Sequence, residues 1–170
     1  MDFVSLAKAR YSCRKLSDKP VEEEKINKII EAIVCAPTAC NIQPFKVWVI
    51  KSEEMLEKVS QTTNFTFDSK TILALGTKSD KAWVRPFDGM NYADVDGTIV
   101  GTQIMLAVQD LGLGTTWVGY FDAPMLKSLI PEMQGYNMIG LFPIGYPADD
   151  AVPAPMHTKS KPTEELVKMI

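Results

Sequence analysis

The sequence predicts one domain in which helices and strands are mixed along the chain. Its 170 residues fit the roughly 100–200 residues of a typical domain and are enough to bury a core. Apolar residues follow a helical period in 21–35 and 92–111, whereas β-branched and other apolar residues run together in 46–51 and 138–144. Because the two kinds of pattern alternate along the chain, we expect a fold that contains both helices and sheet.

Two helices are expected in the first part of the chain. Asp2 can cap a helix that ends near Arg10, where a cation also suits the helix C-terminus. In 21–35 the isoleucines follow the i, i+3, i+4, i+7 spacing of a buried helix face, and glutamates occupy the first turn. Pro37 ends this second helix, because proline cannot continue it.

A strand, a short helix and another strand are expected next. The run 46–51 predicts a buried strand, and Ser52 can cap a helix that continues through Val59. A further strand is expected at 71–76. Two stretches without clear period are expected to be loops: 61–70 and 79–91.

The longest helix is expected at 92–111, central and buried, because apolar residues occupy most of its circumference. Gly112 is its expected stop. Beyond it the pattern predicts a strand at 115–119, a short helix at 122–130 and a last core strand at 138–144.

After Tyr146 four prolines punctuate the chain, so this tail is expected to run extended over a surface before a final short helix that begins at Thr163. Such a tail can pack on its own domain or on a partner subunit, and both possibilities stay open.

The charge balance excludes some classes of partner. With 18 Lys and Arg against 21 Asp and Glu, the formal net charge is −3, so no basic excess indicates nucleic acid or an anionic membrane surface. The first residues do not resemble a secretory signal, and no apolar stretch approaches the roughly 20 residues of a membrane helix. We therefore expect a cytoplasmic protein with no membrane partner.

Hydrolytic and metal chemistry lack their usual residues. The three cysteines have no CxxC spacing, and His157, the only histidine, lies in the proline-rich tail, where it is interpreted as incidental. Asp94 and Asp96 could form an acid/base pair, but acids at the start of a helix also suit its dipole, and capping is the favoured interpretation. By elimination, an organic cofactor is expected to carry the chemistry.

Two basic clusters at opposite ends of the chain indicate an anion site. The first is Arg10-Tyr11-Ser12-Cys13-Arg14, in which two guanidinium groups flank a hydroxyl donor. In the extended tail alternate residues point the same way, so Lys159 and Lys161 could face one anion. Together the clusters predict a phosphorylated cofactor. The alternative for the first cluster is a solvated basic patch at a helix end.

The loop from Pro37 to Pro44 is the third candidate element. Asn41 and Gln43 provide amide donors and acceptors in a stretch otherwise built of small residues. Close approach of a flat ligand would explain the small residues, and the alternative is an ordinary helix-ending loop.

With these motifs in order, the chain resembles the short FMN-dependent nitroreductases along nearly its whole length. The segment 10–14 looks like the Arg-x-Ser-x-Arg phosphate element of that family, and 36–45 looks like its Ala-Pro-Ser/Thr-x-x-Asn-x-Gln-Pro-aromatic loop. The segment 112–119 is similar to the helix-to-strand connection that borders the flavin ring. Finally, 159–162 falls where the family has a basic phosphate-binding tail, although Ser160 stands where many short members have arginine.

The resemblance implies an α+β fold: a mixed sheet sandwiched by helices, with a long central dimer helix and an extended C-terminal tail that is exchanged between subunits. It implies that residues 1–170 form a single FMN-binding domain, and that the protein is a homodimer with FMN at the subunit interface.

The resemblance also implies a set of cofactor contacts. Arg10, Ser12 and a tail residue would hold the FMN phosphate, and Arg14 would lie toward the ribityl chain or pyrimidine edge. The loop of the neighbouring subunit would line the flavin, and the segment after the long helix would face it from within the chain. The implied residues are Arg10, Tyr11, Ser12, Arg14, Pro37, Thr38, Ala39, Asn41, Trp117, Val118, Gly119, Lys159, Ser160 and Lys161.

The implied activity is ping-pong transfer of a hydride from NADH or NADPH, through tightly bound FMN, to a nitroaromatic, a quinone or a similar small acceptor. No side chain need act as a proton donor, and Arg14 would have an electrostatic role. Two alternatives stay open: a non-catalytic FMN carrier or sensor, and a different flavin reduction such as reductive dehalogenation.

Overall fold

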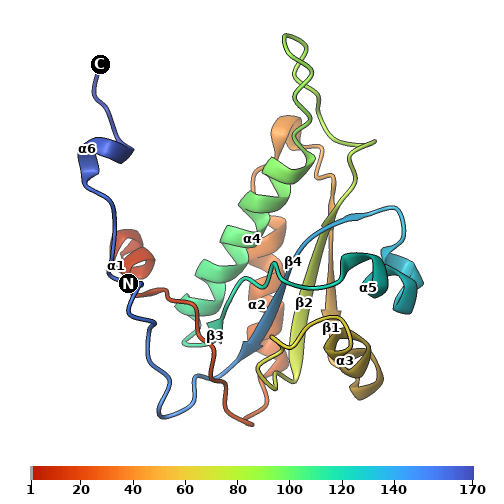
Figure 1. Cartoon of the computed structure of the whole chain (residues 1–170), viewed down its shortest axis with the longest axis vertical. Coiled ribbons are helices and arrows are strands. Elements are labelled where there is room, and N and C mark those ends of the chain that lie inside the picture. Colours follow the sequence, from red (N-terminus) through yellow and green to blue (C-terminus); the bar gives the residue numbers. More distant parts are fainter. Residues whose placement is uncertain (1) are drawn as a thin grey trace.

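A four-stranded antiparallel sheet forms the middle of the molecule (Figure 1). The structure is a computed structural model that describes residues 2–170. The strands lie in the order β1-β2-β4-β3, and their bounds are Phe45–Ile50 for β1, Thr71–Thr77 for β2, Gly114–Thr115 for β3 and Asn137–Gly145 for β4. Every residue of β2 is buried, which requires cover on both faces of the sheet.

Helices supply that cover on each face. Helices α2 (Glu23–Val34) and α4 (Ala93–Asp110) pack on one face, and α3 (Glu53–Ser60) and α5 (Ala123–Leu129) pack on the other (Figure 1). Successive β2 residues alternate between the two cores, as the period of two of a strand requires. The expected α+β sandwich is therefore confirmed.

The sheet is less mixed than expected. All pairings between named strands are antiparallel. The parallel component is the single bridge between Ser12 and Thr115, which places the N-terminal segment beside β3, at one edge of the sheet. The strand β1 forms the other edge.

The helix ends follow the expected signals. Asp2 accepts a hydrogen bond from Ser5 N–H at 3.0 Å and so caps α1 (Phe3–Ala9), while Ser52 accepts from Met55 N–H at 3.4 Å at the start of α3. Gly112, which follows the C-cap residue Leu111 of α4, has φ +70°, the left-handed conformation in which glycine ends helices at little cost.

The strand expected at 115–119 is shorter in the structure. β3 stops at Thr115, although Val118 and Leu141 still exchange backbone hydrogen bonds of 2.8 and 3.0 Å in the same register. That register places Thr116 opposite Pro143. Proline has no N–H to donate, so the ladder is interrupted there.

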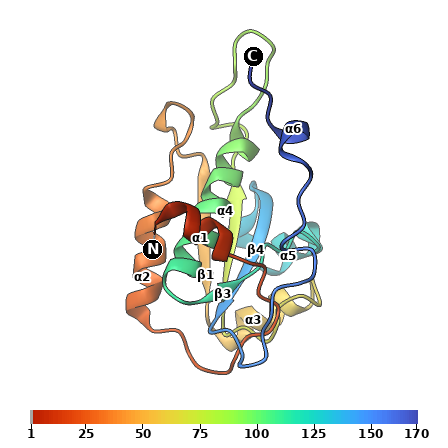
Figure 2. The same ribbon diagram turned by 90° about the vertical axis from the view of Figure 1, so that its left-hand side faces the viewer.

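The N-terminal segment and the C-terminal tail lie on the same side of the molecule (Figure 2). Residues 15–17 bond to 146–148: Ser17 N–H donates to Tyr146 O at 2.8 Å, and Ala148 N–H donates to Lys15 O at 3.1 Å. The tail, expected to be extended, turns at 149–150 and at 155–158 before it reaches α6 (Thr163–Leu166), and it stands off from the body as an arm (Figure 1). Two short 3₁₀ helices complete the fold, η1 (Ala39–Asn41) and η2 (Pro131–Met133). In the part of the chain that is described, every helix is too short or too polar to cross a bilayer.

Candidate cofactor site

The N-terminal arginines and the C-terminal tail line one cavity of about 270 Å³, called the Arg10 cavity below. Its lining residues are Arg10, Ser12 and Arg14 from the N-terminal segment and Ala154, Met156 and His157 from the tail. Residues from the two ends of the chain, widely separated in sequence, therefore meet at one hollow.

Close packing against β3 fixes the N-terminal side of this cavity. Cys13 N–H donates to Thr115 O at 2.9 Å, and the Cys13 side chain is buried. A Cβ on Gly114 would lie 2.7 Å from Cys13 Sγ, so only glycine at this position lets the segment approach the strand so closely. Ser12 and Arg14, on either side of the buried Cys13, line the cavity.

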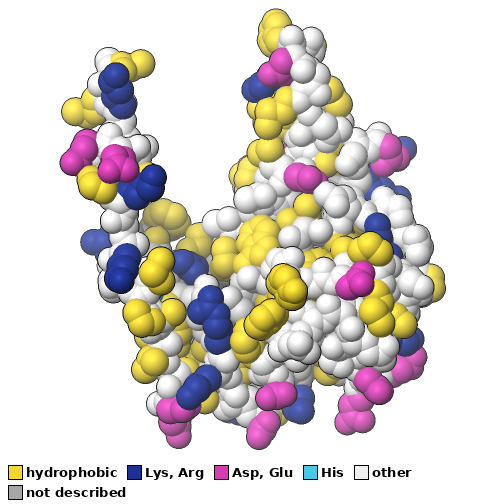
Figure 3. All heavy atoms as spheres, in the orientation of Figure 1, with side chains coloured by type: hydrophobic (Ala, Val, Ile, Leu, Met, Phe, Trp, Pro, Cys, Tyr) yellow, Lys and Arg dark blue, Asp and Glu magenta, His cyan; other side chains and the backbone are white. Residues whose placement is uncertain are grey.

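The arginines of the cavity are not neutralised by acids of the chain. Within residues 2–170 neither Arg10 nor Arg14 takes part in an ion pair, and Arg14 donates only a 3.4 Å bond to Ser12 O. Arg85, by contrast, holds Asp88 through two nitrogens. Figure 3 shows Lys and Arg side chains gathered over the N-terminal segment and the tail. The donor set, two guanidinium groups and a hydroxyl, fits a phosphate group.

Arg14 also lines a second cavity, of about 130 Å³, formed with the segment 116–120 and with Phe65 and Phe67. Trp117, Val118 and Gly119 all contribute to this lining. A Cβ on Gly119 would meet no atom within 4 Å, so open space lies beside it. Arg14 therefore lies between a hollow lined by two arginines and a partly apolar one, an arrangement that fits an elongated ligand with a phosphate at one end.

The sheet holds Trp117 in a slot. Its indole donates to Ile139 O at 3.3 Å and packs edge-on against Phe142, with ring centroids 5.0 Å apart. A Cβ on Gly101 would lie 2.4 Å from the indole ring, and a Cβ on Gly140 would lie 2.5 Å from it. The absence of a side chain at both positions therefore leaves the space that the tryptophan fills. The wall of the second cavity is thus rigidly placed.

Among the expected tail residues, none lines the Arg10 cavity. Lys159, Ser160 and Lys161 are exposed, and Lys161 lies 3.7 Å from Glu165. The tail contributes His157 instead, which the sequence analysis interpreted as incidental. A turn at 155–158 places His157 at the cavity, and no spacing in the sequence indicates that turn.

Tyr11 packs edge-on against His157, with ring centroids 6.2 Å apart. Burial, together with the neighbouring Cys13 thiol, raises the pKa of Tyr11 to about 12. The phenol therefore keeps its proton at physiological pH and cannot serve as a base.

The loop residues expected at the flavin lie apart from both cavities within this chain. Pro37, Thr38, Ala39 and Asn41 line neither hollow, and Pro37 and Asn41 are exposed. Their placement leaves the loop surface available to another molecule.

The acids at the start of α4 do not cap it. The helix has no side-chain cap bond at Tyr92. Asp94 accepts from Thr77 Oγ1 at 3.0 Å and from Asn137 Nδ2, and Asp96 accepts from Ala39 N–H at 2.9 Å. They stand in the first turn as the dipole favours, but their oxygens bond to other elements, because β2, β4 and the 37–44 loop converge there. The capping interpretation was therefore wrong: Asp94 and Asp96 bond to other elements and do not cap the backbone N–H groups of α4.

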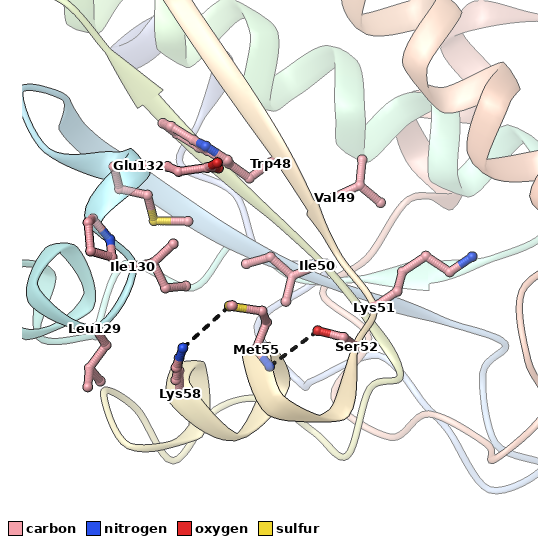
Figure 4. A pocket seen from close by; sticks show the side chains of 12 residues that line it. Trp48, Val49, Ile50, Lys51, Ser52, Met55, Lys58, Leu129, Ile130 and Glu132 are labelled. Carbon is pink, nitrogen blue, oxygen red and sulfur yellow. Dashed lines mark hydrogen bonds between the residues drawn. The ribbon is translucent and has the colours of Figure 1, made fainter.

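A third cavity, about 480 Å³ and called the Trp48 cavity below, lies at the opposite edge of the sheet between β1, α3, α5 and η2 (Figure 4). Ile50 and Met55 point toward Ile130 across it. Its two lysines are engaged elsewhere, Lys51 with Glu23 and Lys58 with Glu54. None of the expected site residues lines it, and no group of three potential metal ligands occurs among residues 2–170.

Comparisons with known proteins agree on one family. The profile of the nitroreductase family matches residues 7–64 and 60–146. A solved nitroreductase family protein from Clostridium difficile 630 is 34% identical with a TM-score of 0.91, and the match covers 99% of this chain and 98% of that one. A Methanothermobacter thermautotrophicus protein with NADH dehydrogenase/NAD(P)H nitroreductase in its name is 29% identical over 162 residues, 88% of this chain and 80% of that protein.

A protein from Exiguobacterium sibiricum, solved in complex with FMN, shares the fold. Its TM-score is 0.84 at 19% identity, and the match covers 100% of this chain and 98% of that one. The profile match extends over most of the chain, including the Arg10 segment, the 37–44 loop and the α4–β3 connection. The chain belongs to the nitroreductase family.

Proposed function

We propose that this chain is an FMN-dependent oxidoreductase that passes a hydride from NADH or NADPH to a small acceptor, such as a nitroaromatic compound or a quinone. One observation supports the proposal above all: Arg10, Ser12 and Arg14 meet the tail in one cavity. The two arginines have no ion partner within residues 2–170. The family membership and the FMN bound to a protein of the same fold support it.

Charge supports a phosphate at this cavity. A phosphate monoester carries about −1.5 to −2 charges at neutral pH, which the two guanidinium groups of Arg10 and Arg14 offset. Ser12 adds a hydroxyl donor, and His157 adds an imidazole from the tail. Lys159 follows two residues later, has no ion partner within residues 2–170 and could supply further positive charge.

The position of Arg14 supports an electrostatic role. Bound FMN would supply the hydride chemistry, and the protein would supply binding, orientation and charge. Arg14 lies between the Arg10 cavity and the cavity of Trp117, Val118 and Gly119, where its positive charge would stabilise negative charge on a reduced ring. Tyr11 keeps its proton, so we assign it no role as a base.

A second subunit is part of the proposal. The Arg10 cavity alone, at about 270 Å³, is smaller than the roughly 300–1,000 Å³ of typical ligand pockets, which is consistent with a flavin site that a second surface helps to enclose. Large apolar side chains are exposed on α1, at the end of α2 and along the tail arm, namely Phe3, Val4, Val34, Leu166 and Val167. We propose a cytoplasmic homodimer in which the 37–44 loop of one protomer covers the flavin of the other.

Spectroscopy of the purified protein tests the function. We expect a yellow protein, or one that becomes yellow with one FMN per chain, and we expect anaerobic NADH or NADPH to bleach the flavin band. A protein that takes up no FMN would contradict the proposal. A flavin that stays oxidised under both nucleotides would instead identify a carrier. Light scattering after size exclusion measures the dimer separately.

A further inference from the structure

The first turn of α4 carries two aspartates with different surroundings. Asp94 is exposed, and Thr77 and Asn137 donate to its carboxylate. Asp96 is 1% exposed, and one of its oxygens accepts from Ala39 N–H at 2.9 Å, while the other has no partner among residues 2–170. A buried carboxylate with a single partner outside its own helix needs an explanation.

The partner of Asp96 lies in a strained loop. Cys40, Asn41 and Gln43 all have left-handed backbones, with φ between 52° and 54°. Such conformations are unfavourable for residues other than glycine and persist only where the surroundings impose them. Inside the loop Gln43 N–H donates to Thr38 Oγ1 at 3.0 Å. The Asp96–Ala39 bond links the middle of the loop to the core.

Asp96 stands on a rigid support. Its own N–H donates to Tyr92 O at 2.8 Å in the helix. The next residue, Gly97, packs so closely on β2 that a Cβ would lie 2.6 Å from Thr77 Cγ2. The carboxylate therefore has a fixed position relative to the sheet, and it transmits that position to the Ala39 amide.

We propose that Asp96 is a positioning residue that sets the conformation of the 37–44 loop for contact with the flavin of the partner subunit. The inference rests on the proposed function, because the loop meets flavin only in that dimer. Asp96 itself lines neither the Arg10 cavity nor the cavity of Trp117, Val118 and Gly119. It acts through the backbone of Ala39, and the unusual φ angles of the next residues follow from that anchor.

Hydrogen exchange of the flavin-free protein tests the anchor directly. In Asp96→Ala we expect the Ala39 amide to exchange about tenfold faster than in wild type, because its acceptor is gone. Asp96→Asn keeps an acceptor oxygen and should restore most of the protection. Asp94→Ala is the matched control, two positions away with bonds to β2 and β4, and should leave the Ala39 amide unchanged.

A loop-side variant covers the case in which Asp96→Ala does not fold. Ala39→Pro removes the donor and leaves α4 intact. Thr38 has φ −133° and ψ 158°, the extended backbone that a residue before proline prefers, and Ala39 opens a 3₁₀ turn, where proline is tolerated. We expect faster exchange at Asn41 and Ile42 in this variant.

Flavin titration adds the functional consequence. Asp96→Ala and Ala39→Pro should raise the FMN dissociation constant about tenfold, and Asp94→Ala should not. Wild-type exchange in both anchor variants, or equal acceleration in Asp94→Ala, overturns the inference. A wild-type protein that binds no FMN overturns the proposed function instead, while the exchange result still decides whether Asp96 holds the loop.

Discussion

The two edges of the sheet carry cavities of opposite character. At the β1 edge the Trp48 cavity, about 480 Å³, is walled mainly by apolar side chains, and its lysines are paired with Glu23 and Glu54. At the β3 edge the Arg10 cavity is smaller, about 270 Å³, and its arginines have no acidic partner within residues 2–170.

The difference shows which property marks a candidate site in this fold. Volume alone would select the Trp48 cavity over the Arg10 cavity. Two arginines without an acidic partner within residues 2–170 that line one hollow select the Arg10 cavity, whereas the third arginine of the sequence, Arg85, is paired with Asp88. We therefore expect substitutions at the β1 edge to change stability and substitutions at the β3 edge to change flavin binding.

The largest effect is expected at the β1 edge. Met133 is fully buried and lines the Trp48 cavity, so Met133→Ala enlarges a hollow and should lower the free energy of unfolding by about 2–5 kcal/mol. Met133→Leu, which conserves volume, should cost less than about 1.5 kcal/mol. Urea denaturation measures both. Loss of FMN affinity in the folded Met133→Leu protein would contradict the expectation that the β1 edge affects stability and not flavin binding.

At the β3 edge, Arg10→Ala should raise the FMN dissociation constant roughly tenfold to a hundredfold, since a hydrogen bond to a charged group contributes about 1.5–3 kcal/mol. Fluorescence titration measures it. Arg85→Ala, which removes an arginine already paired with Asp88, is the control and should bind FMN as wild type does. Equal weakening in the two variants would mean that net charge, not the cavity, governs binding.

Two glycines near Trp117 separate packing from binding. Gly140→Ala places a methyl group 2.5 Å from Trp117 Nε1 and should destabilise the protein by about 1–3 kcal/mol. Gly119→Ala meets no atom within 4 Å, so its unfolding free energy should stay near that of wild type, while FMN binding weakens because the methyl group enters the open cavity. Unchanged FMN affinity in Gly119→Ala would show that the cavity beside Gly119 is not part of the flavin site.

The smallest effect concerns the ion pair that ties the tail to the N-terminal segment. The hydrogen bond and charge of Lys15 lower the pKa of Asp150 below 3.8. The ion pair therefore contributes to the free energy of unfolding above pH 3.8, and this contribution is lost as the pH falls through the lower pKa that Asp150 has in the folded state. Both side chains are well exposed, so the contribution is small. The free energy of unfolding, measured by urea denaturation, should change slightly less between pH 6 and pH 3 in Lys15→Met than in wild type. An equal change in the two proteins would show that the pair contributes nothing.

Local patterns predicted most of the fold. The isoleucine spacing of α2, the caps at Asp2 and Ser52 and the stop at Gly112 depend on neighbouring residues, and the structure has each of them. The strand after Gly112 is shorter than expected because its partner is a proline far along the chain, at position 143.

Long-range contacts were harder to predict at the site. Adjacent residues in the sequence were enough to predict the Arg10 cluster. The positive charges at both ends of the chain predicted that this cluster and the tail meet. The sequence could not show that His157, and not Lys159, lines the cavity within one chain, since that depends on the turn at 155–158. The bonds of Asp94 and Asp96 depend on β2, β4 and the 37–44 loop, which no local pattern brings together.

A crystal structure of the protein with FMN tests the central claim most directly. The account predicts that the flavin phosphate lies within hydrogen-bonding distance of Arg10 and Ser12, with the ring beside Trp117 to Gly119. A phosphate bound elsewhere, or a flavin seated in the Trp48 cavity, would contradict it.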